Sequence, residues 1–253
     1  MCLILIAYGV HTDLPLVIAA NRDEFYDRPA EPAGFWPDEP RILAGRDLKQ
    51  GGTWLGVTRD GRFAAVTNIR RAQPPTGDRP SRGRIPVDFL SGDLPAQDFL
   101  AQLRPAAHDY DGFNLILADA DGLFVYSNGD DQVRALVPGL HAISNDLPSA
   151  VWPKTQRGLA LLSDWLETAS REPAPLLDLM MDEHRPPDTA LPDTGIGLSL
   201  ERVLAPMFIR SEKYGTRCTS ALLFGRDIIT FAERGYRDGV AETELAFTLP
   251  RRD

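Results

Sequence analysis

The sequence predicts one α+β domain, residues 1–253, in which antiparallel sheets are covered by helices. Two observations predict this class. Short apolar runs occur in pairs around turn signals, and segments with helical periodicity fall between those pairs. The length of 253 residues allows one large domain or two small ones. Because no internal repeat or low-complexity linker divides the chain, we expect a single domain.

The strands are predicted from apolar runs that flank Gly, Pro and Asp residues. The expected hairpins join Cys2–Ala7 to Leu16–Ala20, Gly52–Thr58 to Arg62–Asn68, Phe113–Ala118 to Leu123–Ser127, Val133–Val137 to Leu140–Ser144, and Thr219–Phe224 to Ile228–Ala232. Glu242–Leu249 is expected to be a last alternating strand. Most strand pairs should therefore be antiparallel.

The longest predicted helix, Pro153–Ser170, carries Leu159, Leu162, Leu166 and Ala169 on one stripe. Shorter helices are expected over Pro86–Leu90, Gln97–Leu103 and Ala174–Glu183. Arg70–Arg84 and Arg185–Gly197 lack a period and contain several prolines, which indicates loops.

Composition excludes several functional classes. A net charge of −9 argues against a nucleic-acid binder, which needs a dominant basic face. No apolar run approaches the length of a membrane-spanning helix, and Met1–Ala7 lacks the features of a signal peptide, so we expect a cytoplasmic protein. Two cysteines and four scattered histidines provide neither a disulfide framework nor a metal site. No nucleotide-binding fingerprint occurs, and no cofactor is expected. The oligomeric state stays open.

Polar residues gather at the predicted strand ends. The first hairpin should place Cys2 opposite about residue 20, beside the tetrapeptide Asn21-Arg22-Asp23-Glu24. Asn68 should end its strand opposite Gly51-Gly52, whose missing side chains would leave backbone N–H groups open to a ligand. Asn145 and Arg217 lie next to the ends of other strands.

This set is suited to nucleophilic catalysis once Met1 is removed. Cys2 would then carry a thiol and a free α-amine, and the amine can serve as the base of the thiol. Arg22 or Arg217 near the sulfur would favour the thiolate. Asp23 would orient the ammonium, and the amides of Asn68 and Asn145 would hold an oxyanion.

Each of these residues also has a purely structural interpretation. Cys2 and Cys218 are compatible with core packing, and Trp54 either packs in the core or lines a pocket. Asn68 and Asn145 are suited to satisfying turn backbone groups, and Arg217 to an exposed strand position. The loop Arg70–Arg84 contains five arginines and one acid; it is either solvated or grips an anionic ligand through Arg79, Arg82 and Arg84.

The motifs resemble those of one family along most of the chain. Met1-Cys2-Leu-Ile-Leu-Ile, Ala20-Asn21-Arg22-Asp23-Glu24-Phe25, Leu43-Ala-Gly-Arg46-Asp47, Gly51-Gly52-Thr53-Trp54, Thr67-Asn68, Ser81-Arg82-Gly83, Ser144-Asn145 and Tyr214-Gly215-Thr216-Arg217 carry the resemblance. Their order is similar to that of the NRDE family, also called the transport and Golgi organisation 2 family. This resemblance implies haem trafficking or the handling of acyl-CoA or lipid.

A more distant resemblance is to the choloylglycine hydrolases and penicillin V acylases, and it implies a four-layered αββα N-terminal-nucleophile hydrolase-like fold. Their N-terminal Cys and early Asp match Cys2 and Asp23 here, and their Thr-Asn oxyanion pair resembles Ser144-Asn145. Their late Arg matches Arg217 and their other Asn matches Asn68. In those hydrolases an Arg precedes the first strand-end Asn, whereas Ala20 stands there in this chain and Arg22 follows.

Two functions follow as expectations. The first is a Cys2-dependent amidohydrolase acting on a linear amide or acyl bond, with Asn21 and Trp54 as further substrate-binding residues. The second is a non-catalytic carrier of haem, acyl-CoA or another anionic lipid.

Overall fold

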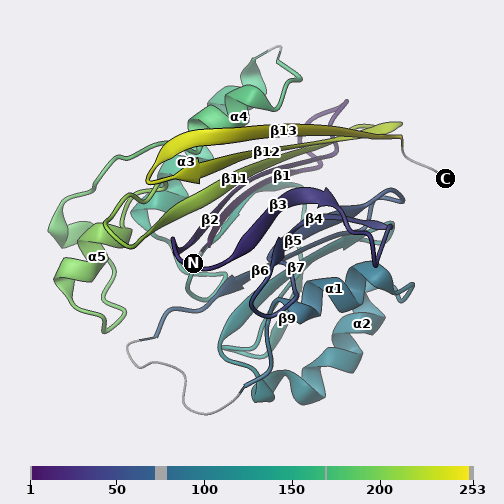
Figure 1. The fold of residues 1–253 in the computed structure, drawn as a ribbon, viewed down its shortest axis with the longest axis horizontal. Helices are drawn as coiled ribbons and strands as arrows, with labels where there is room; N and C mark the ends of the chain where they lie inside the picture. The colour runs from purple at the N-terminus through teal and green to yellow at the C-terminus, as the bar shows by residue number, and fades with distance from the viewer. Residues whose placement is uncertain (1, 72–78, 169, 251–253) are drawn as a thin grey trace.

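The computed structural model describes residues 2–71, 79–168 and 170–250 (Figure 1). Its strands are β1 (Cys2–Tyr8), β2 (Leu16–Phe25), β3 (Ala30–Phe35), β4 (Ile42–Asp47), β5 (Leu55–Thr58), β6 (Phe63–Asn68), β7 (Phe113–Asp119), β8 (Gly122–Ser127), β9 (Gln132–Ala135), β10 (Gly139–Ile143), β11 (Tyr214–Phe224), β12 (Ile228–Arg237) and β13 (Val240–Pro250). Its helices are α1 (Arg84–Ser91), α2 (Ala96–Leu103), α3 (Pro153–Glu167), α4 (Ala174–Leu179), α5 (Leu198–Leu204) and two 3-10 helices, η1 (Arg104–Asp109) and η2 (Asp188–Ala190).

The strands form two antiparallel sheets that stack face to face. One has six strands in the order β10-β1-β2-β11-β12-β13, and the other has seven in the order β3 to β9. Ile4, Ile18 and Phe231 from the first sheet pack against Val57 and Ile116 from the second, which makes the central core. The central strands carry apolar side chains on both faces, so each sheet also presents a second apolar face to the helices.

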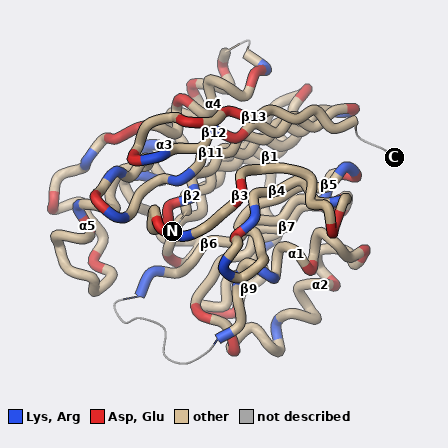
Figure 2. Tube along the Cα trace, in the orientation of Figure 1, with Lys and Arg blue, Asp and Glu red and all other residues tan. Residues whose placement is uncertain are grey.

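Helices cover both outer faces. α3 and α4 pack on the six-stranded sheet, whereas α1 and α2 pack on the seven-stranded sheet, as Figure 1 shows at the top and lower right. The predicted α+β class and the αββα layering are therefore confirmed. Among the described residues, no helix is both long enough and apolar enough to cross a membrane. Basic and acidic positions are interspersed along the chain (Figure 2).

Most of the predicted hairpins are present, because their turn signals lie between runs that alternate correctly. β1–β2, β5–β6, β7–β8 and β11–β12 pair as expected, and β13 adds to β12. The hairpin predicted across Pro138-Gly139 is wrong. β9 pairs with β8 at the edge of one sheet, and β10 pairs with β1 at the edge of the other. The Pro-Gly signal marks a crossing between sheets.

Besides the two 3-10 helices, two strands and one α-helix were not predicted. β3 contains Pro32, β4 contains Gly45 followed by charged residues, and the short α5 lies beyond a Pro-rich segment. β2 also continues past Ala20 through the charged tetrapeptide to Phe25. Each departs from the apolar patterns that sequence reasoning depends on.

The buried stripe of α3 differs from the predicted one. Leu162 is buried and Leu166 packs partly buried against the same core, as expected. The other buried residues of the helix are Lys154, Thr155, Gly158 and Trp165 rather than Leu159. A Cβ at Gly158 would lie 2.8 Å from a methyl group of Leu5, so the glycine allows α3 to cross β1 closely. Ala169 lies outside the described residues.

Candidate functional site

Cys2, Arg22 and Cys218 lie side by side on the face of the six-stranded sheet that points toward the other sheet. Cys2 pairs with Arg22 across β1 and β2, and Arg22 pairs with Cys218 across β2 and β11. The register differs by two residues from the expected pairing of Cys2 with residue 20. Cys2 is 7% exposed, and together with Arg22 and Cys218 it lines a cavity of about 370 Å³, here called the first cavity.

Asn21 and Asp23 project from the opposite face of β2, because side chains alternate along a strand. Asn21 is fully buried and donates to the backbone carbonyls of Met180 and Met207 at 2.8 and 2.9 Å. It therefore fixes the helical layer and lies outside the lining of both cavities described here.

The Asp23 carboxylate accepts a 2.7 Å hydrogen bond from the hydroxyl of Thr216. Burial raises the pKa of Asp23, while Lys154 and the Thr216 hydrogen bond act in the opposite direction. Strand alternation thus directs the thiol of Cys2 and the carboxylate of Asp23 to opposite faces of the sheet, although Asp23 is also among the residues that line the first cavity. The backbone nitrogen of Cys2, at the start of β1, lies between these faces.

Burial raises the pKa of the Cys2 thiol to about 11, although the neighbouring Arg22 guanidinium lowers it. The thiol is therefore protonated at neutral pH, and it needs a base to react. Arg22 favours the thiolate, as expected from sequence, but its effect is smaller than that of burial.

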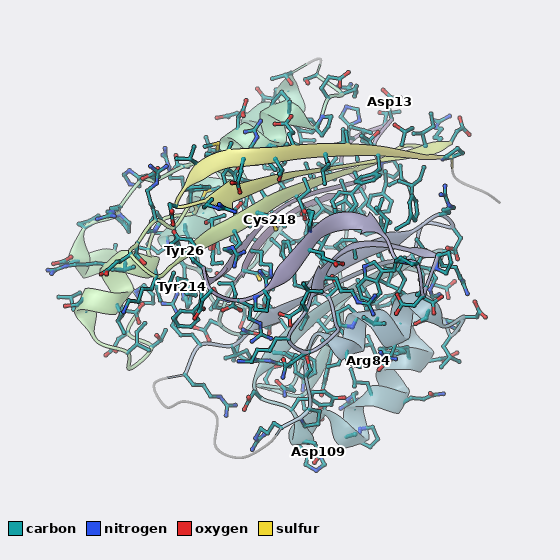
Figure 3. All side chains as sticks on the ribbon, viewed as in Figure 1. Asp13, Tyr26, Arg84, Asp109, Tyr214 and Cys218 are labelled. Atoms are coloured by element: carbon teal, nitrogen blue, oxygen red, sulfur yellow. The ribbon has the colours of Figure 1, made fainter. Side chains whose placement is uncertain are left out.

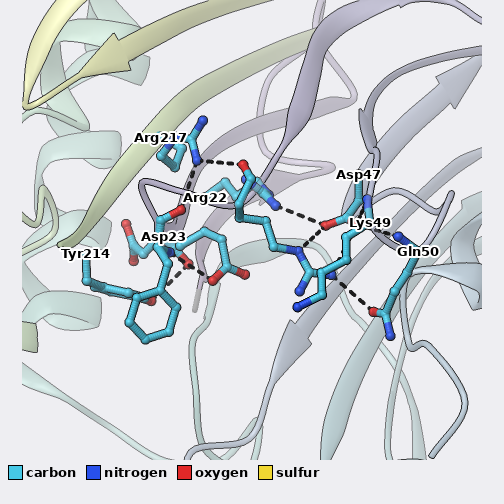
Figure 4. A network of polar contacts seen from close by, with 10 residues as sticks. Arg22, Asp23, Asp47, Lys49, Gln50, Tyr214 and Arg217 are labelled. Carbon is cyan, nitrogen blue, oxygen red and sulfur yellow. Dashed lines mark hydrogen bonds and ion pairs between the residues drawn. The ribbon is translucent and has the colours of Figure 1, made fainter.

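Asp47 contacts two arginines that line the first cavity together with it (Figure 4). Arg28 makes a two-pronged contact with its carboxylate at 2.6 and 3.1 Å, and Arg22 approaches it at 3.5 Å. Burial alone would raise the pKa of Asp47, but the hydrogen bonds from Arg28 and Gln50 outweigh it and lower the pKa. The carboxylate is accordingly ionised and orients both guanidinium groups.

Arg217 is the extra residue of a β-bulge in β11, where the register shifts between Thr216 and Cys218. Its guanidinium donates to the backbone carbonyls of Phe25 and Arg28 at 2.9 and 3.0 Å (Figure 4). Arg217 lines the first cavity and also clamps the connection between β2 and β3.

Asn68 lies at the end of β6 and lines the first cavity together with Trp54. Asn145 is fully buried and lies outside the cavity lining. Its side-chain amide donates to the backbone carbonyl of Asn68 at 3.0 Å. The two asparagines are thus brought together, but only Asn68 faces the cavity.

A second cavity of about 570 Å³ adjoins the first, with Glu24, Asn68 and Arg82 lining both. Its described apolar lining includes Phe25, Ile69, Ile196, Leu200, Val203 and Leu204. Arg71, Arg79 and Arg82 supply the basic part of the lining along with Arg70, which pairs with Glu201.

The predicted loop arginines divide into two groups. Arg82 donates to the carbonyl of Gly112 at 3.1 Å, and Arg79 donates to the carbonyl of Tyr110 at 2.9 Å and pairs with Asp111. Arg84 begins α1, is exposed, pairs with Asp88 and lies outside both cavities; Figure 3 shows it over the helical layer, away from Cys218. Residues 72–78 of this loop lie outside the described residues.

Sequence reasoning missed Arg28, Asp47, Glu233 and the cavity position of Cys218. One signal was available for Glu233. It follows Phe231 by two residues in β12, so alternation places both on the same face of the sheet. No grouping of three or more metal-ligating His, Cys, Asp or Glu side chains occurs among residues 2–71, 79–168 and 170–250.

Comparison with known proteins agrees with the motifs. The family model described as Transport and Golgi organisation 2 matches residues 1–238. The chain is 36% identical over 242 residues to the Transport and Golgi organization protein 2 homolog of Homo sapiens, covering 88% of this chain and 87% of that protein. It is 26% identical over 234 residues to Transport and Golgi organization protein 2 of Drosophila melanogaster, covering 82% and 81%.

Two solved structures are more distantly similar. An N-acylethanolamine-hydrolyzing acid amidase ortholog of Caenorhabditis elegans gives a TM-score of 0.44 at 10% identity, covering 88% of this chain and 92% of its own. The C2A mutant of the conjugated bile acid hydrolase of Clostridium perfringens gives 0.47 at 10% identity, covering 100% and 94%. The sequence matches, which span most of both partners, show that this chain belongs to the Transport and Golgi organisation 2 family.

Proposed function

We propose that this protein is a Cys2-dependent N-terminal-nucleophile amidohydrolase that cleaves a linear amide or related acyl bond. The observation that carries the proposal is the position of Cys2 in the first cavity, with Arg22 beside its thiol and Asp23 on the opposite face of the sheet. Removal of Met1 would free the α-amine of Cys2 between the thiol and that carboxylate.

The reaction follows from these three groups. The α-amine takes the thiol proton, and Sγ bonds to the carbonyl carbon of the substrate. The resulting ammonium, held by Asp23, gives its proton to the leaving nitrogen, the C–N bond breaks, and a thioester remains on Cys2. Water, deprotonated by the same amine, then releases the carboxylic acid and restores the thiol.

The amide of Asn68 is the proposed donor to the tetrahedral oxyanion, because it ends β6 at the cavity. Asn145 acts through Asn68 by holding its backbone carbonyl and is therefore a positioning residue. Arg217 keeps the β2–β3 connection, and with it Arg28, in place.

A thiol-reactive acyl probe tests this proposal. Intact-mass analysis should first show a protein without Met1, and the probe should then acylate Cys2 and be released slowly as the free acid. Cys2→Ala should abolish labelling, while Cys218→Ser should retain it. A purified protein that keeps Met1, or labelling that survives Cys2→Ala, contradicts the proposal.

The second cavity favours a second candidate, a non-catalytic carrier of haem, acyl-CoA or another anionic lipid. Its apolar lining and its Arg71, Arg79 and Arg82 side chains suit a ligand with an apolar body and an anionic end. Titration with haem and with a long-chain acyl-CoA should give saturable binding. Arg79→Gln with Arg82→Gln should weaken this binding, whereas Arg84→Gln serves as a control outside both cavities.

Cys2→Ala separates the two candidates. A carrier should keep its affinity, since Cys2 lines only the first cavity, whereas a hydrolase should lose all turnover.

A further inference from the structure

Glu233 is a buried carboxyl group in the wall of the first cavity that the proposed reaction does not use. It is 3% exposed and projects from β12 toward the other sheet. One oxygen, Oε1, accepts the backbone N–H of Ala33 in β3 at 2.7 Å, and Oε2 lies 3.3 Å from the hydroxyl of Ser220. Glu233 therefore bridges the two sheets at the cavity.

The protein groups around Glu233 favour its ionised form. Burial raises the pKa of Glu233, while the hydrogen bonds from Ala33, Cys218 and Ser220 and the charge of Arg22 lower it. Gly45 and Gly235 line the same part of the cavity, and a Cβ built on Gly45 would lie 3.8 Å from Oε2. A Cβ at Gly235 would lie 2.4 Å from the hydroxyl of Thr243, so Thr243 already fills that space, whereas the missing side chain at Gly45 leaves room beside the carboxylate.

Arg22 presents the opposite charge in the same cavity. Its side chain is 11% exposed, and its ion pair is the 3.5 Å approach to Asp47, a carboxylate already engaged by Arg28. Within the part of the chain that the structure describes, Arg22 forms no ion pair with Glu233. A guanidinium has five donors, so Arg22 retains capacity for an anionic group in the cavity.

The spacing of these groups follows from the sheet. Arg22 lies one strand from Cys2, about 5 Å away. Glu233 lies two strands further on and two residues along the strand, because it pairs with Ser220 rather than with Cys218, so its backbone is about 12 Å from that of Arg22. Cys218 lies between Arg22 and the strand of Glu233. The cavity is thus lined in this order by the thiol of Cys2, the guanidinium of Arg22 and the carboxylate of Glu233.

We propose that the first cavity binds a dipolar, basic amino-acid-like group, with its carboxylate on Arg22 and its ammonium on Glu233. This inference rests on the proposed function, because it makes that group the leaving half of the amide cleaved at Cys2. An amide formed on the α-amine of such an amino acid has its carbonyl carbon close to the carboxylate. Its side-chain ammonium lies several bonds further away. The carbonyl carbon, the carboxylate and the ammonium of the ligand thus follow the same order as Cys2, Arg22 and Glu233 in the cavity. The acyl half extends into the second cavity past Asn68 and Arg82.

Calorimetric binding to the full-length Cys2→Ala protein tests the dipolar site without turnover. Three probes form a matched set: Nα-octanoyl-lysine carries both charges, Nα-octanoyl-norleucine lacks the ammonium, and N-octanoyl-cadaverine lacks the carboxylate. The lysine conjugate should bind about tenfold or more tightly than either of the others, as expected for a hydrogen bond to a charged group.

Two variants in the same background locate the selectivity. Glu233→Gln should weaken the lysine conjugate about tenfold and leave the norleucine conjugate unchanged. Glu31→Gln removes the same charge at an exposed position of the cavity rim and should change neither affinity. Thermal unfolding of both variants establishes that they are folded.

Equal affinities for the lysine and norleucine conjugates, or no binding of either, would overturn the dipolar site even if the Glu233 variant did not fold. An equal loss in Glu31→Gln and Glu233→Gln would overturn it as well. Selective binding without hydrolysis by the processed wild-type protein would contradict the proposed reaction alone. Hydrolysis without selectivity would contradict the dipolar site alone.

Discussion

The side-chain amide of Asn145 holds the backbone carbonyl of Asn68 at 3.0 Å, and the backbone carbonyl of Asn145 accepts the N–H of Arg70 at 2.7 Å. These two bonds fix the end of β6 against the segment that follows β10. The position of Asn68, which lines the cavity, therefore depends on Asn145, which is buried outside the cavity lining.

Asn145→Ala should lower the free energy of unfolding by about 1–3 kcal/mol, because the fully buried amide of Asn145 is removed and the part-buried carbonyl of Asn68 loses its donor. Acylation of Cys2 should slow as Asn68 loses its position. Asn68→Ala should slow acylation at least as much but cost less stability, since Asn68 is only half-buried. Denaturant unfolding and probe kinetics measure both effects, and a larger stability loss in Asn68→Ala would contradict this assignment.

The raised pKa of Cys2 makes its reactivity strongly dependent on pH in protein that retains Met1. Alkylation by iodoacetamide should be slow at pH 7 and should rise about tenfold per pH unit until it levels off near the pKa of about 11. Mass spectrometry of the modified peptide distinguishes Cys2 from Cys218. A rate that levels off near pH 8 would show that the thiol is not desolvated in this way.

The same pKa shift links the fold to alkaline pH. Burial raises the folded-state pKa of Cys2 above its unfolded value, so its contribution to stability is complete below the unfolded pKa of about 8.5. That contribution is lost as pH rises toward 11. Cys2→Ser should therefore show a flatter stability curve above pH 9 than the wild type in denaturant titrations. Stability curves of the wild type and Cys2→Ser that stay parallel above pH 9 would argue against a raised pKa of Cys2.

Glu233 has the corresponding linkage at acidic pH. Because its folded pKa is raised, the contribution of Glu233 to stability is greatest below the unfolded carboxyl pKa of about 4.3 and decreases above it. Glu233→Gln should thus stabilise the protein at pH 7 and lose this advantage at pH 4. Unfolding curves at the two pH values measure the difference. A destabilised variant at pH 7 would mean that the ionised group is fully compensated.

Gly51 and Gly52 should respond very differently to substitution. A Cβ at Gly52 would lie 2.4 Å from the backbone carbonyl of Gly83, so Gly52→Ala must displace the segment that carries Arg82. Gly51 has a φ of +72° and open space around it, so Gly51→Ala should cost only about 1 kcal/mol of backbone strain. Thermal unfolding should rank Gly52→Ala as clearly the less stable, and similar losses would contradict the close approach.

These glycines also illustrate how much the sequence predicts. The hairpin around residues 59–61 is predictable because its turn signal and strand alternation agree. The role of Gly52 is not, because it depends on Gly83, which approaches from a distant segment. The expectation of open N–H groups applies poorly to Gly51, whose N–H bonds to the carbonyl of Asp47 within its own turn.

The candidate site shows the same division. Cys2 and Arg22 meet because strand pairing brings them together, and this pairing can be inferred from the first hairpin. Asn68 belongs to the other sheet and reaches the same cavity through the stacking of the two sheets. Arg28 and Asp47 join them through β3 and β4, whose strands contain Pro32 and Gly45 and lack a clear alternating pattern. Glu233 reaches the cavity because β11 lies beside β2, and the sheet order rather than any local motif determines that pairing of distant strands.

The crossing of the chain between the two sheets at Pro138-Gly139 limits how far the sheets can move apart. Gly139 pairs with Tyr8, at the end of β1 opposite to Cys2, whereas the β2–β3 connection crosses between the sheets at the Cys2 end. Short chain segments therefore connect the two sheets at both ends: the β9–β10 connection at one end and the β2–β3 connection at the other. These connections oppose a hinged separation of the two sheets. Amide hydrogens of β1, β2 and β11 should accordingly exchange together, as one cooperative unit that opens only on global unfolding.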